Sequence, residues 1–420
     1  MKVLIQKTHI LDPHSPFHET DHDIFINNGV IEEIGNNLQV SADHIIHHPN
    51  LHCSPGWVDV FAHFNDPGYE FKETLETGAA AAAAGGYTDV FVIPNTKPVI
   101  DSKSQAEYIS RRSRTLPVTI HPIGAITKNT EGKDLAEMYD MRASGAIAFS
   151  DGLNPVQSAG LLLKALQYVK AFDGIIIQIP DDKSVGMNGL MHEGVISTRL
   201  GLPGKPMMAE ELLVARDIKL ARYTSSKLHI TGVTSPRSIE YIRRAKDAGL
   251  QVTCSVTPYH LIFTDHDLQE YDTNLKVYPP LRTMDDALQL RKAVEDGTVD
   301  CIATHHMPHE SDSKILEFEY AKFGMTGLET AYAVLKQTMP SVSETRWVEL
   351  LSINPRRIFG LPQQTINKNQ PSALTLFDPK AGWLMSENNI RSKSKNSPFI
   401  NASLNGKIIG ILNGVQLTLN

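Results

Sequence analysis

The stretch WVDVFAHFNDPG, residues 57–68, decides the fold of this chain. It begins with a mostly apolar run, residues 57–62, and ends in the polar side chains His63, Asn65 and Asp66 before a Pro-Gly turn. A short apolar run bounded by a turn is typical of a buried strand. Polar groups directly after such a strand are expected where a barrel opens to its substrate. This segment therefore predicts a strand that ends at a functional mouth.

The same pattern recurs along the middle of the chain. Further apolar runs, each followed by a loop and a helical pattern, lie at 88–93, 118–126, 146–150, 175–179, 227–233, 252–258 and 301–306. Apolar strands that alternate with helices indicate a parallel sheet buried on both faces. Eight such units favour a closed (β/α)8 TIM barrel over an open doubly wound sheet. No GxGxxG motif follows an early strand, which argues against a dinucleotide site.

Both ends of the chain have a different character. Residues 1–56 and 360–420 contain short alternating or apolar runs separated by Asn-Gly turns, such as the turn at 27–29. Such turns connect antiparallel strands in hairpins. We therefore predict an α/β fold in which a barrel over residues 57–359 is flanked by one small composite β-domain built from both termini.

Composition excludes several classes of function. Hydrophobic residues make up 41% and charged residues 21% of the chain, as in a globular protein with a substantial core. The formal charge of -7 supplies no basic footprint for nucleic acid. No apolar stretch approaches the roughly 20 residues that span a bilayer. Without the features of a signal peptide near residue 1, and with only three cysteines, the expected location is the cytoplasm.

Several motifs carry a family resemblance. The chain resembles the dihydroorotase family of the amidohydrolase superfamily in the segments DPGYEFKETLETG (66–78), GGYTDVFVIPNTKP (85–98), MHEG (191–194), VTPYHLIFTD (256–265), NLKVYPPLR (274–282), DCIATHHMPH (300–309) and FGMTGLETA (323–331). The resemblance implies a barrel that closes carbamoyl aspartate to dihydroorotate and reopens it. It also implies one or two zinc ions that polarise a carbonyl and activate water.

The zinc ligands expected from the resemblance are mostly absent. The six ligand positions of the family correspond here to Phe61, His63, Asp151, Gln178, Gly232 and His305. Only His63 and Asp151 keep the expected residue type, and His305 stands where the family has the aspartate that acts as general base. Catalytic zinc needs about three protein ligands. The resemblance therefore implies that a two-metal site cannot be assembled from these positions.

The substrate contacts are altered as well. Asn65 stands where the family has an arginine that clamps the substrate carboxylate, and Tyr278 replaces an asparagine and is expected to intrude on the pocket. Losing a charge-assisted contact of this kind costs about 1.5–3 kcal/mol. Asn95 and His309 remain as family-like substrate contacts.

Two functional hypotheses follow. The first is a catalytically inactive dihydroorotase-like protein of pyrimidine biosynthesis, without a cofactor, that forms a homodimer and serves as a structural partner of aspartate transcarbamoylase. The alternative is an active cyclic amidohydrolase, a dihydroorotase or a related ring-amide hydrolase, with a single zinc ion at His63, Asp151 and His305. In the alternative, His306 or His309 would carry protons.

Three other segments carry weaker expectations. The interval 181–205 is long and rich in glycine, and is either a lid or subunit contact or a structural excursion. The basic run RSKSK at 391–395 is expected to be a solvated loop. The histidine-rich tract at 44–52 could bind metal, although solvated or structural histidines are favoured.

Overall fold

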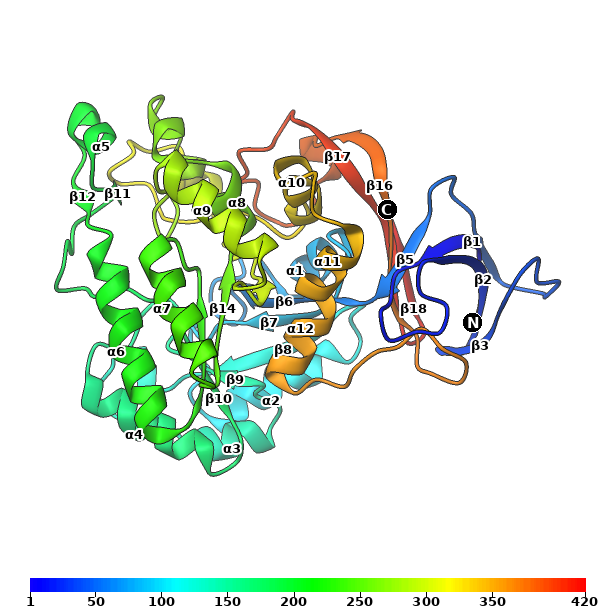
Figure 1. Cartoon of the computed structure of the whole chain (residues 1–420), viewed down its shortest axis with the longest axis horizontal. Helices are drawn as coiled ribbons and strands as arrows, with labels where there is room; N and C mark the ends of the chain where they lie inside the picture. The colour runs from blue at the N-terminus through cyan, green and yellow to red at the C-terminus, as the bar shows by residue number, and fades with distance from the viewer.

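The structure, a computed structural model, describes residues 1–420 and contains the predicted barrel. Its strands run in parallel in the order in which they occur in the sequence (Figure 1), namely β6 (Trp57–Ala62), β7 (Tyr87–Val92), β8 (Thr119–Gly124), β9 (Ala148–Phe149), β10 (Ile175–Gln178), β13 (Lys227–Thr231), β14 (Val252–Val256) and β15 (Cys301–Ile302). A parallel bridge between Ala62 and His306 joins the first strand to the segment after the last. The backbone N–H of His63 donates to the His306 carbonyl at 2.9 Å, which nearly closes the barrel. The (β/α)8 prediction is confirmed.

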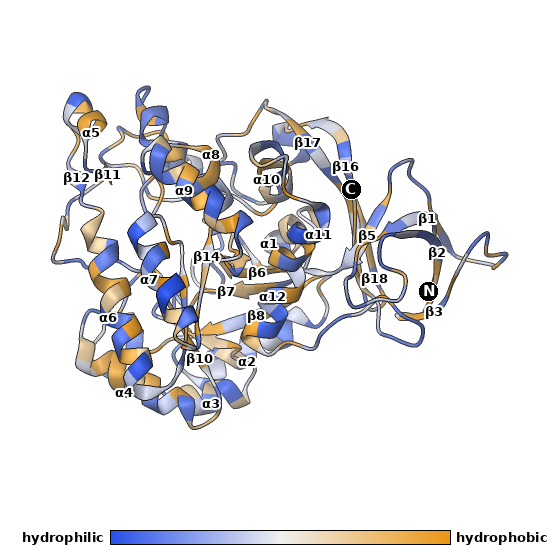
Figure 2. Ribbon diagram, in the orientation of Figure 1, coloured by the Kyte–Doolittle hydropathy of each residue, from blue (hydrophilic) through white to orange (hydrophobic).

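Helices surround the barrel (Figure 1), except the short helix at residues 195–200, which belongs to the 181–205 segment. They are α1 (Leu75–Ala84), α2 (Lys103–Ser113), α3 (Met138–Ala143), α4 (Ala159–Lys170), α5 (Val195–Leu200), α6 (Met208–Thr224), α7 (Pro236–Asp247), α8 (Pro258–Ile262), α9 (Met284–Glu295), α10 (Ala331–Thr338), α11 (Glu344–Val348) and α12 (Asn354–Phe359). Several begin where a side-chain oxygen caps a free backbone N–H, as Thr74, Ser235 and Thr283 do. Figure 2 shows polar faces on α6 and α7 and apolar strands within the barrel.

The run of small residues in α1 has a packing reason. A Cβ atom on Gly78 would lie only 2.6 Å from the ring of Phe64, which follows the first barrel strand. Glycine therefore allows this helix to approach the loop that leads from β6. The close approach holds the polar residues after β6 against the mouth of the barrel.

A second sheet combines the two ends of the chain. Its strands are β1 (Lys2–Ile10), β2 (Thr20–Asn27), β3 (Val30–Gly35), β4 (His44–Ile46), β5 (His52–Pro55), β16 (Ala373–Leu384), β17 (Ser403–Asn413) and β18 (Gln416–Leu419). They follow the order β18-β17-β16-β5-β1-β2-β3, with β4 beside β1, and the antiparallel β5–β16 pair joins the termini. The β2–β3 turn has positive φ at Asn28 (46°) and Gly29 (82°), as the Asn-Gly pattern predicts.

These strand bounds support the division of the chain that we propose, with a barrel over 57–359 and a small β-domain from 1–56 and 360–420. The C-terminal part nevertheless reaches the barrel. Residues 390–397, which we call the mouth strap, lie against loops at the barrel mouth. The 181–205 segment is also ordered, because it holds α5 and the parallel pair β11 (Met191–His192) and β12 (Gly204–Lys205).

Candidate functional site at the barrel mouth

A cavity of ≈ 410 Å³ opens at the carboxyl ends of the barrel strands. Its lining consists of Leu153, Asp181, Lys183, Met187, Gly189, Lys205, Tyr259, Tyr278, Pro280, His305, Met307, Phe323 and Gly324. Reactive groups in TIM barrels lie at this end of the strands. A mostly apolar cavity of this size with a few polar groups is the usual form of a small-molecule site.

One side of the cavity carries a polar triad of buried Lys205 and Asp181 with the half-buried Tyr278. The ammonium of Lys205 lies 2.7 Å from Asp181 Oδ1, and the Tyr278 hydroxyl donates to Asp181 Oδ2 at 2.7 Å. Burial, followed by the negative charge of Asp181, raises the pKa of the Tyr278 phenol well above its usual value. Tyr278 therefore stays protonated and acts as a hydrogen-bond donor to the carboxylate. Sequence reasoning placed Tyr278 at the pocket but did not identify its two partners.

His305 forms part of the cavity floor in an unusual conformation. Its φ is 46°, and its ring lies 4.6 Å from the ring of Phe61 between centroids. A Cβ atom at Gly232 would lie 2.7 Å from His305 Cε1, so glycine at 232 leaves room for this imidazole. Burial lowers the pKa of His305 to about 3, and the ring is therefore neutral at neutral pH.

A chain of hydrogen bonds connects His305 to the barrel interior. His305 Nε2 lies 2.8 Å from Thr231 Oγ1, and the Ser255 hydroxyl donates to Thr231 Oγ1 at 2.8 Å. Ser255 Oγ lies 3.0 Å from His229 Nε2, and His229 Nδ1 lies 2.9 Å from Thr253 Oγ1. Burial lowers the pKa of His229 to about 3. Barrel interiors are usually filled by branched apolar side chains, so this polar stripe along β13 and β14 is a feature that our sequence reasoning missed.

The first two proposed metal ligands already have hydrogen-bond partners. His63 Nε2 lies 3.1 Å from the Asn95 carbonyl oxygen, and burial lowers the pKa of His63 to about 3. The Asp151 carboxylate accepts from the backbone N–H groups of Ile126 and Thr127 at 2.9 and 2.8 Å, and also from the Thr127 hydroxyl. Burial raises the pKa of Asp151 to about 6 despite these hydrogen bonds.

The residues at the mouth do not fit a three-ligand metal site in this arrangement. No group of three His, Cys, Asp or Glu side chains is placed to share a metal ion. The third proposed ligand, His305, uses Nε2 in its contact with Thr231. Zinc at His63, Asp151 and His305 would require each side chain to leave its present partner.

The other positions named from the resemblance lie outside the cavity lining. Asn65 is buried, with its side-chain nitrogen 3.5 Å from the Pro308 carbonyl, and Gln178 Nε2 lies 3.5 Å from Asp217. Asn95 Nδ2 donates to the Asp151 carbonyl at 3.1 Å, and His309 Nε2 lies 2.9 Å from the Phe323 carbonyl. Of the altered and retained positions, Tyr278 and His305 are therefore the two in the cavity wall.

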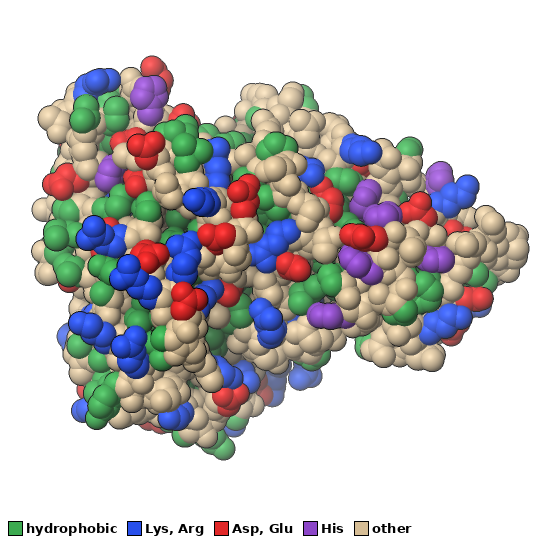
Figure 3. All heavy atoms as spheres, viewed as in Figure 1, with side chains coloured by type: hydrophobic (Ala, Val, Ile, Leu, Met, Phe, Trp, Pro, Cys, Tyr) green, Lys and Arg blue, Asp and Glu red, His purple; other side chains and the backbone are tan.

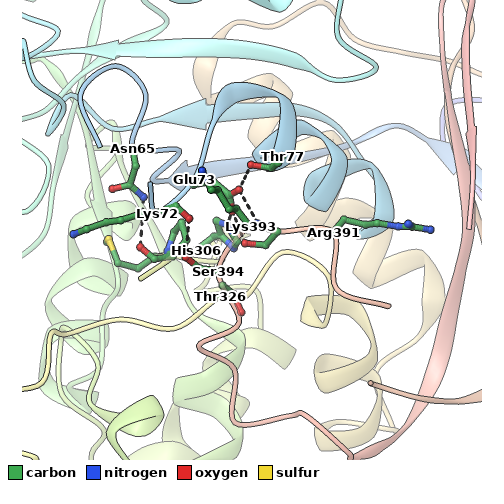
Figure 4. A network of polar contacts seen from close by, with 12 residues as sticks. Asn65, Lys72, Glu73, Thr77, His306, Thr326, Arg391, Lys393 and Ser394 are labelled. Carbon is green, nitrogen blue, oxygen red and sulfur yellow. Dashed lines mark hydrogen bonds and ion pairs between the residues drawn. The ribbon is translucent and has the colours of Figure 1, made fainter. Parts of the chain in front are cut away.

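The mouth strap is tied to a buried carboxylate (Figure 4). Glu73 is fully buried and accepts hydrogen bonds from the Lys393 backbone N–H at 3.0 Å and from the hydroxyls of Ser392 and Thr77. His306 Nε2 lies 3.4 Å from the same carboxylate. Burial opposes the charge of Glu73, but the contacts with His306, Ser392 and Thr77 outweigh it and lower the pKa of this carboxyl.

Asn396 in the mouth strap holds the loop after β15. Its side-chain nitrogen donates to the Met307 carbonyl at 2.9 Å, and its side-chain oxygen accepts from the His309 backbone N–H at 2.9 Å. The Ser394 hydroxyl also donates to the Lys72 carbonyl at 2.6 Å. The prediction of a solvated loop at 391–395 therefore holds for the exposed basic side chains but not for Ser392 and Ser394, which are buried. Its backbone and hydroxyl groups find partners far away in the sequence, which composition alone does not indicate.

The histidine-rich tract lies in the terminal sheet, away from the mouth. Figure 3 shows histidines gathered over the β5–β16 region of the surface. His48 Nδ1 lies 3.3 Å from Asp378, and the rings of His9 and His52 meet edge to face with centroids 5.1 Å apart. No three side chains there are placed for a metal ion. The space-filling view also shows acidic and basic side chains interspersed.

Comparison with known proteins identifies the family. The family model for dihydro-orotase-like proteins matches residues 52–238. A curated protein named dihydroorotase from Syntrophus aciditrophicus is 39% identical over 416 residues, which cover 97% of each chain. A dihydroorotase from Geobacter metallireducens is 39% identical over 415 residues, 97% of this chain and 96% of that one.

Solved structures support the fold. L-Hydantoinase (dihydropyrimidinase) from Arthrobacter aurescens matches with a TM-score of 0.87 at 21% identity, over 100% of this chain and 96% of that chain. Dihydropyrimidinase from Brevibacillus agri matches with a TM-score of 0.85 at 18% identity, over 100% of this chain and 95% of that chain. No helix of the present chain is long and apolar enough to cross a membrane.

The comparisons also correct the first functional hypothesis. Full-length identity of 39% to several curated dihydroorotases favours an active enzyme over an inactive structural subunit. The hypothesis considered only the positions at which the family carries its metal ligands and substrate contacts. It could not weigh groups such as Lys205 and Asp181, which the fold brings into the cavity. On the family match and the full-length relatives together, the chain belongs to the dihydroorotase family of the amidohydrolase superfamily.

Proposed function

We propose that this protein catalyses the reversible opening of a cyclic amide, with dihydroorotate as the substrate, in the cavity at the barrel mouth. The observation that carries the proposal is the 39% identity with curated dihydroorotases over 97% of this chain. The cavity volume of ≈ 410 Å³ lies within the usual range of about 300–1,000 Å³ for small-ligand sites.

The chemistry sets demands on the cavity. Water must add to the ring carbonyl, the ring C–N bond must break, and the nitrogen must gain a proton as the new carboxyl group loses one. Hydrolysis therefore needs a group that accepts a proton and a group that donates one. The neutral imidazole of His305 has one protonated and one unprotonated nitrogen. We assign proton transfer to His305 because it lines the cavity at the position where the family has its general base.

No step is assigned to a metal ion, since the donors at the mouth do not fit a three-ligand site as they are arranged. Bound zinc would supply carbonyl polarisation and activated water. Protein prepared with and without added zinc therefore forms two arms of the same activity measurement.

The test is the interconversion of dihydroorotate and carbamoyl aspartate by the purified chain, followed chromatographically in both directions. We expect turnover, and we expect His305→Ala to reduce it by about 100-fold or more, the usual contribution of a general acid–base. Glu131→Gln, at an exposed position in the β8–α3 loop, is the matched control. Absence of turnover by folded wild-type protein, with and without zinc, would refute the proposed function.

We further propose that the protein works in the cytoplasm, as its sequence features suggest, and as a homodimer, as the family resemblance implies. Light scattering on the purified chain measures the oligomeric state. A monomer at micromolar concentration would contradict the dimer.

A further inference from the structure

We propose that Lys205 and Lys183, both carried by the segment after β10, bind the carboxylate of an anionic ring substrate. This inference rests on the proposed function and specifies the substrate class that the cavity accepts. It places the anion site on the opposite side of the mouth from Asn65, the position at which the resemblance implied a carboxylate clamp.

The charges that line the cavity are unbalanced. The lining contains two lysines, Lys183 and Lys205, and one carboxylate, Asp181. The formal charge of the lining is therefore +1. A ligand with one negative charge neutralises it, whereas an uncharged ring leaves the excess positive charge in a largely apolar cavity.

Each lysine retains capacity to bind an anion. The Lys205 ammonium has three N–H donors, and its ion pair with Asp181 at 2.7 Å uses one of them. Asp181 also accepts from the Tyr278 hydroxyl, so both of its oxygens are occupied. Lys183 Nζ donates to the neutral Asn154 Oδ1 at 3.3 Å and forms no ion pair with a carboxylate.

The other side of the mouth offers no cation to the cavity. Asn65 is neutral, is 1% exposed, and does not line the cavity. Lys72 lies 3.5 Å from His309 Nδ1 and is also outside the lining. A ring carboxylate inside the cavity therefore finds its positive partners on the β10 side.

Local packing brings the two lysines to the same wall. A Cβ atom on Gly189 would lie 2.5 Å from the Lys205 Cβ and 2.7 Å from its Cα, so glycine is needed for this close approach. The backbone N–H of Gly189 also donates to the carbonyl of Gly186, which tightens the turn. The segment that carries Lys183 is thus folded back onto the strand that carries Lys205. The 181–205 excursion acts as a recognition element for the substrate.

The test is calorimetric binding of two planar ring probes to the full chain. Orotate carries the carboxylate, and uracil is the same ring without it. We expect wild-type protein to bind orotate at least tenfold more tightly than uracil. Lys183→Met should weaken orotate binding about fivefold, as for a partly exposed ion pair, and should leave uracil binding unchanged. Lys133→Met, at an exposed lysine that does not line the cavity, is the matched control.

Two further variants test Lys205. Lys205→Met leaves Asp181 buried without its cation, so the double variant Asp181→Asn/Lys205→Met is measured beside it. In whichever of these variants keeps the wild-type circular dichroism spectrum, we expect the preference for orotate over uracil to fall at least tenfold. Equal binding of the two probes by wild-type protein, binding of neither, or an unchanged preference in Lys183→Met would overturn the inference. Failure of the proposed function would give a different result: the protein would still bind orotate but would not turn over dihydroorotate.

Discussion

Replacing Glu73 with glutamine tests whether the buried network under the mouth strap stabilises the protein. Glu73 accepts three hydrogen bonds, from the Lys393 backbone and the Ser392 and Thr77 hydroxyls, and lies 3.4 Å from His306 Nε2. Glutamine keeps the shape but removes the charge and turns one acceptor into a donor. A bond to a charged group is worth about 1.5–3 kcal/mol and a neutral one about 0.5–1.5. Losing about 1 kcal/mol at each of three bonds predicts a destabilisation of about 3 kcal/mol.

The effect of Glu73→Gln should depend on pH with a definite sign. The contacts with His306, Ser392 and Thr77 outweigh burial and hold the pKa of Glu73 below its ordinary value. A carboxyl whose pKa is lowered by folding stabilises the protein above its unfolded pKa of about 4.3. That stabilisation is lost as the pH falls through the lower pKa of the folded state. The free-energy difference between wild type and variant should therefore be full at pH 7 and shrink below about pH 4.

Urea titration followed by circular dichroism measures this difference through the midpoint and slope of unfolding. Glu131→Gln makes the same chemical change at an exposed site and should leave the midpoint unchanged. Because the network holds the loop that carries His305, Glu73→Gln should also slow dihydroorotate turnover. Two results would refute the reasoning. One is a Glu73→Gln midpoint equal to that of wild type at pH 7, and the other is a free-energy difference between the two proteins that grows as the pH falls.

Three further changes probe other parts of the site. Thr231→Val removes the hydroxyl 2.8 Å from His305 Nε2, so zinc affinity, measured against a competing chelator, should rise roughly two- to tenfold; an unchanged affinity would show that this contact does not restrict the imidazole. Burial raises the pKa of Asp59 to about 7, so its ionisation costs stability as the pH rises from about 4 through 7. Asp59→Asn should accordingly reduce the loss of melting temperature between pH 5 and pH 8. An equal loss of melting temperature in wild type and variant would contradict this. Asn396→Ala removes three side-chain hydrogen bonds, two of 2.9 Å and one of 3.2 Å, and should cost about 2–3 kcal/mol in urea unfolding, which an unaltered midpoint would exclude.

The mouth strap has contacts that could not be predicted from the sequence. The basic run 391–395 has the composition of a solvated loop, yet Ser392 and Ser394 are buried. Their partners include Glu73 and Lys72, more than 300 positions earlier in the chain. Only the closed barrel brings these segments together. Composition describes the chemistry of a side chain and not which distant group it meets.

The functional hypothesis was limited in the same way. Counting ligand positions led to an inactive subunit, whereas the full-length relatives favour an enzyme. The count could show that Phe61 and Gly232 stand at positions where the family has metal ligands. It could not show that Gly232 makes room for the His305 ring, or that Lys205 lies 2.7 Å from Asp181 in the cavity wall. Such contacts depend on backbone approach, which a pattern of residue types does not contain.

The sequence by itself determined the strands and helices of this protein. Apolar runs with the period of a buried strand, alternating with helical patterns, predicted the barrel from β6 to β15, and Asn-Gly turns predicted the terminal strands. These features follow from local propensity and periodicity, which each segment carries alone. Only the tertiary structure decided which charges meet at the mouth. Lys183, Asp181 and Lys205 are brought to one wall because Gly189 lets a long loop pack back against β12.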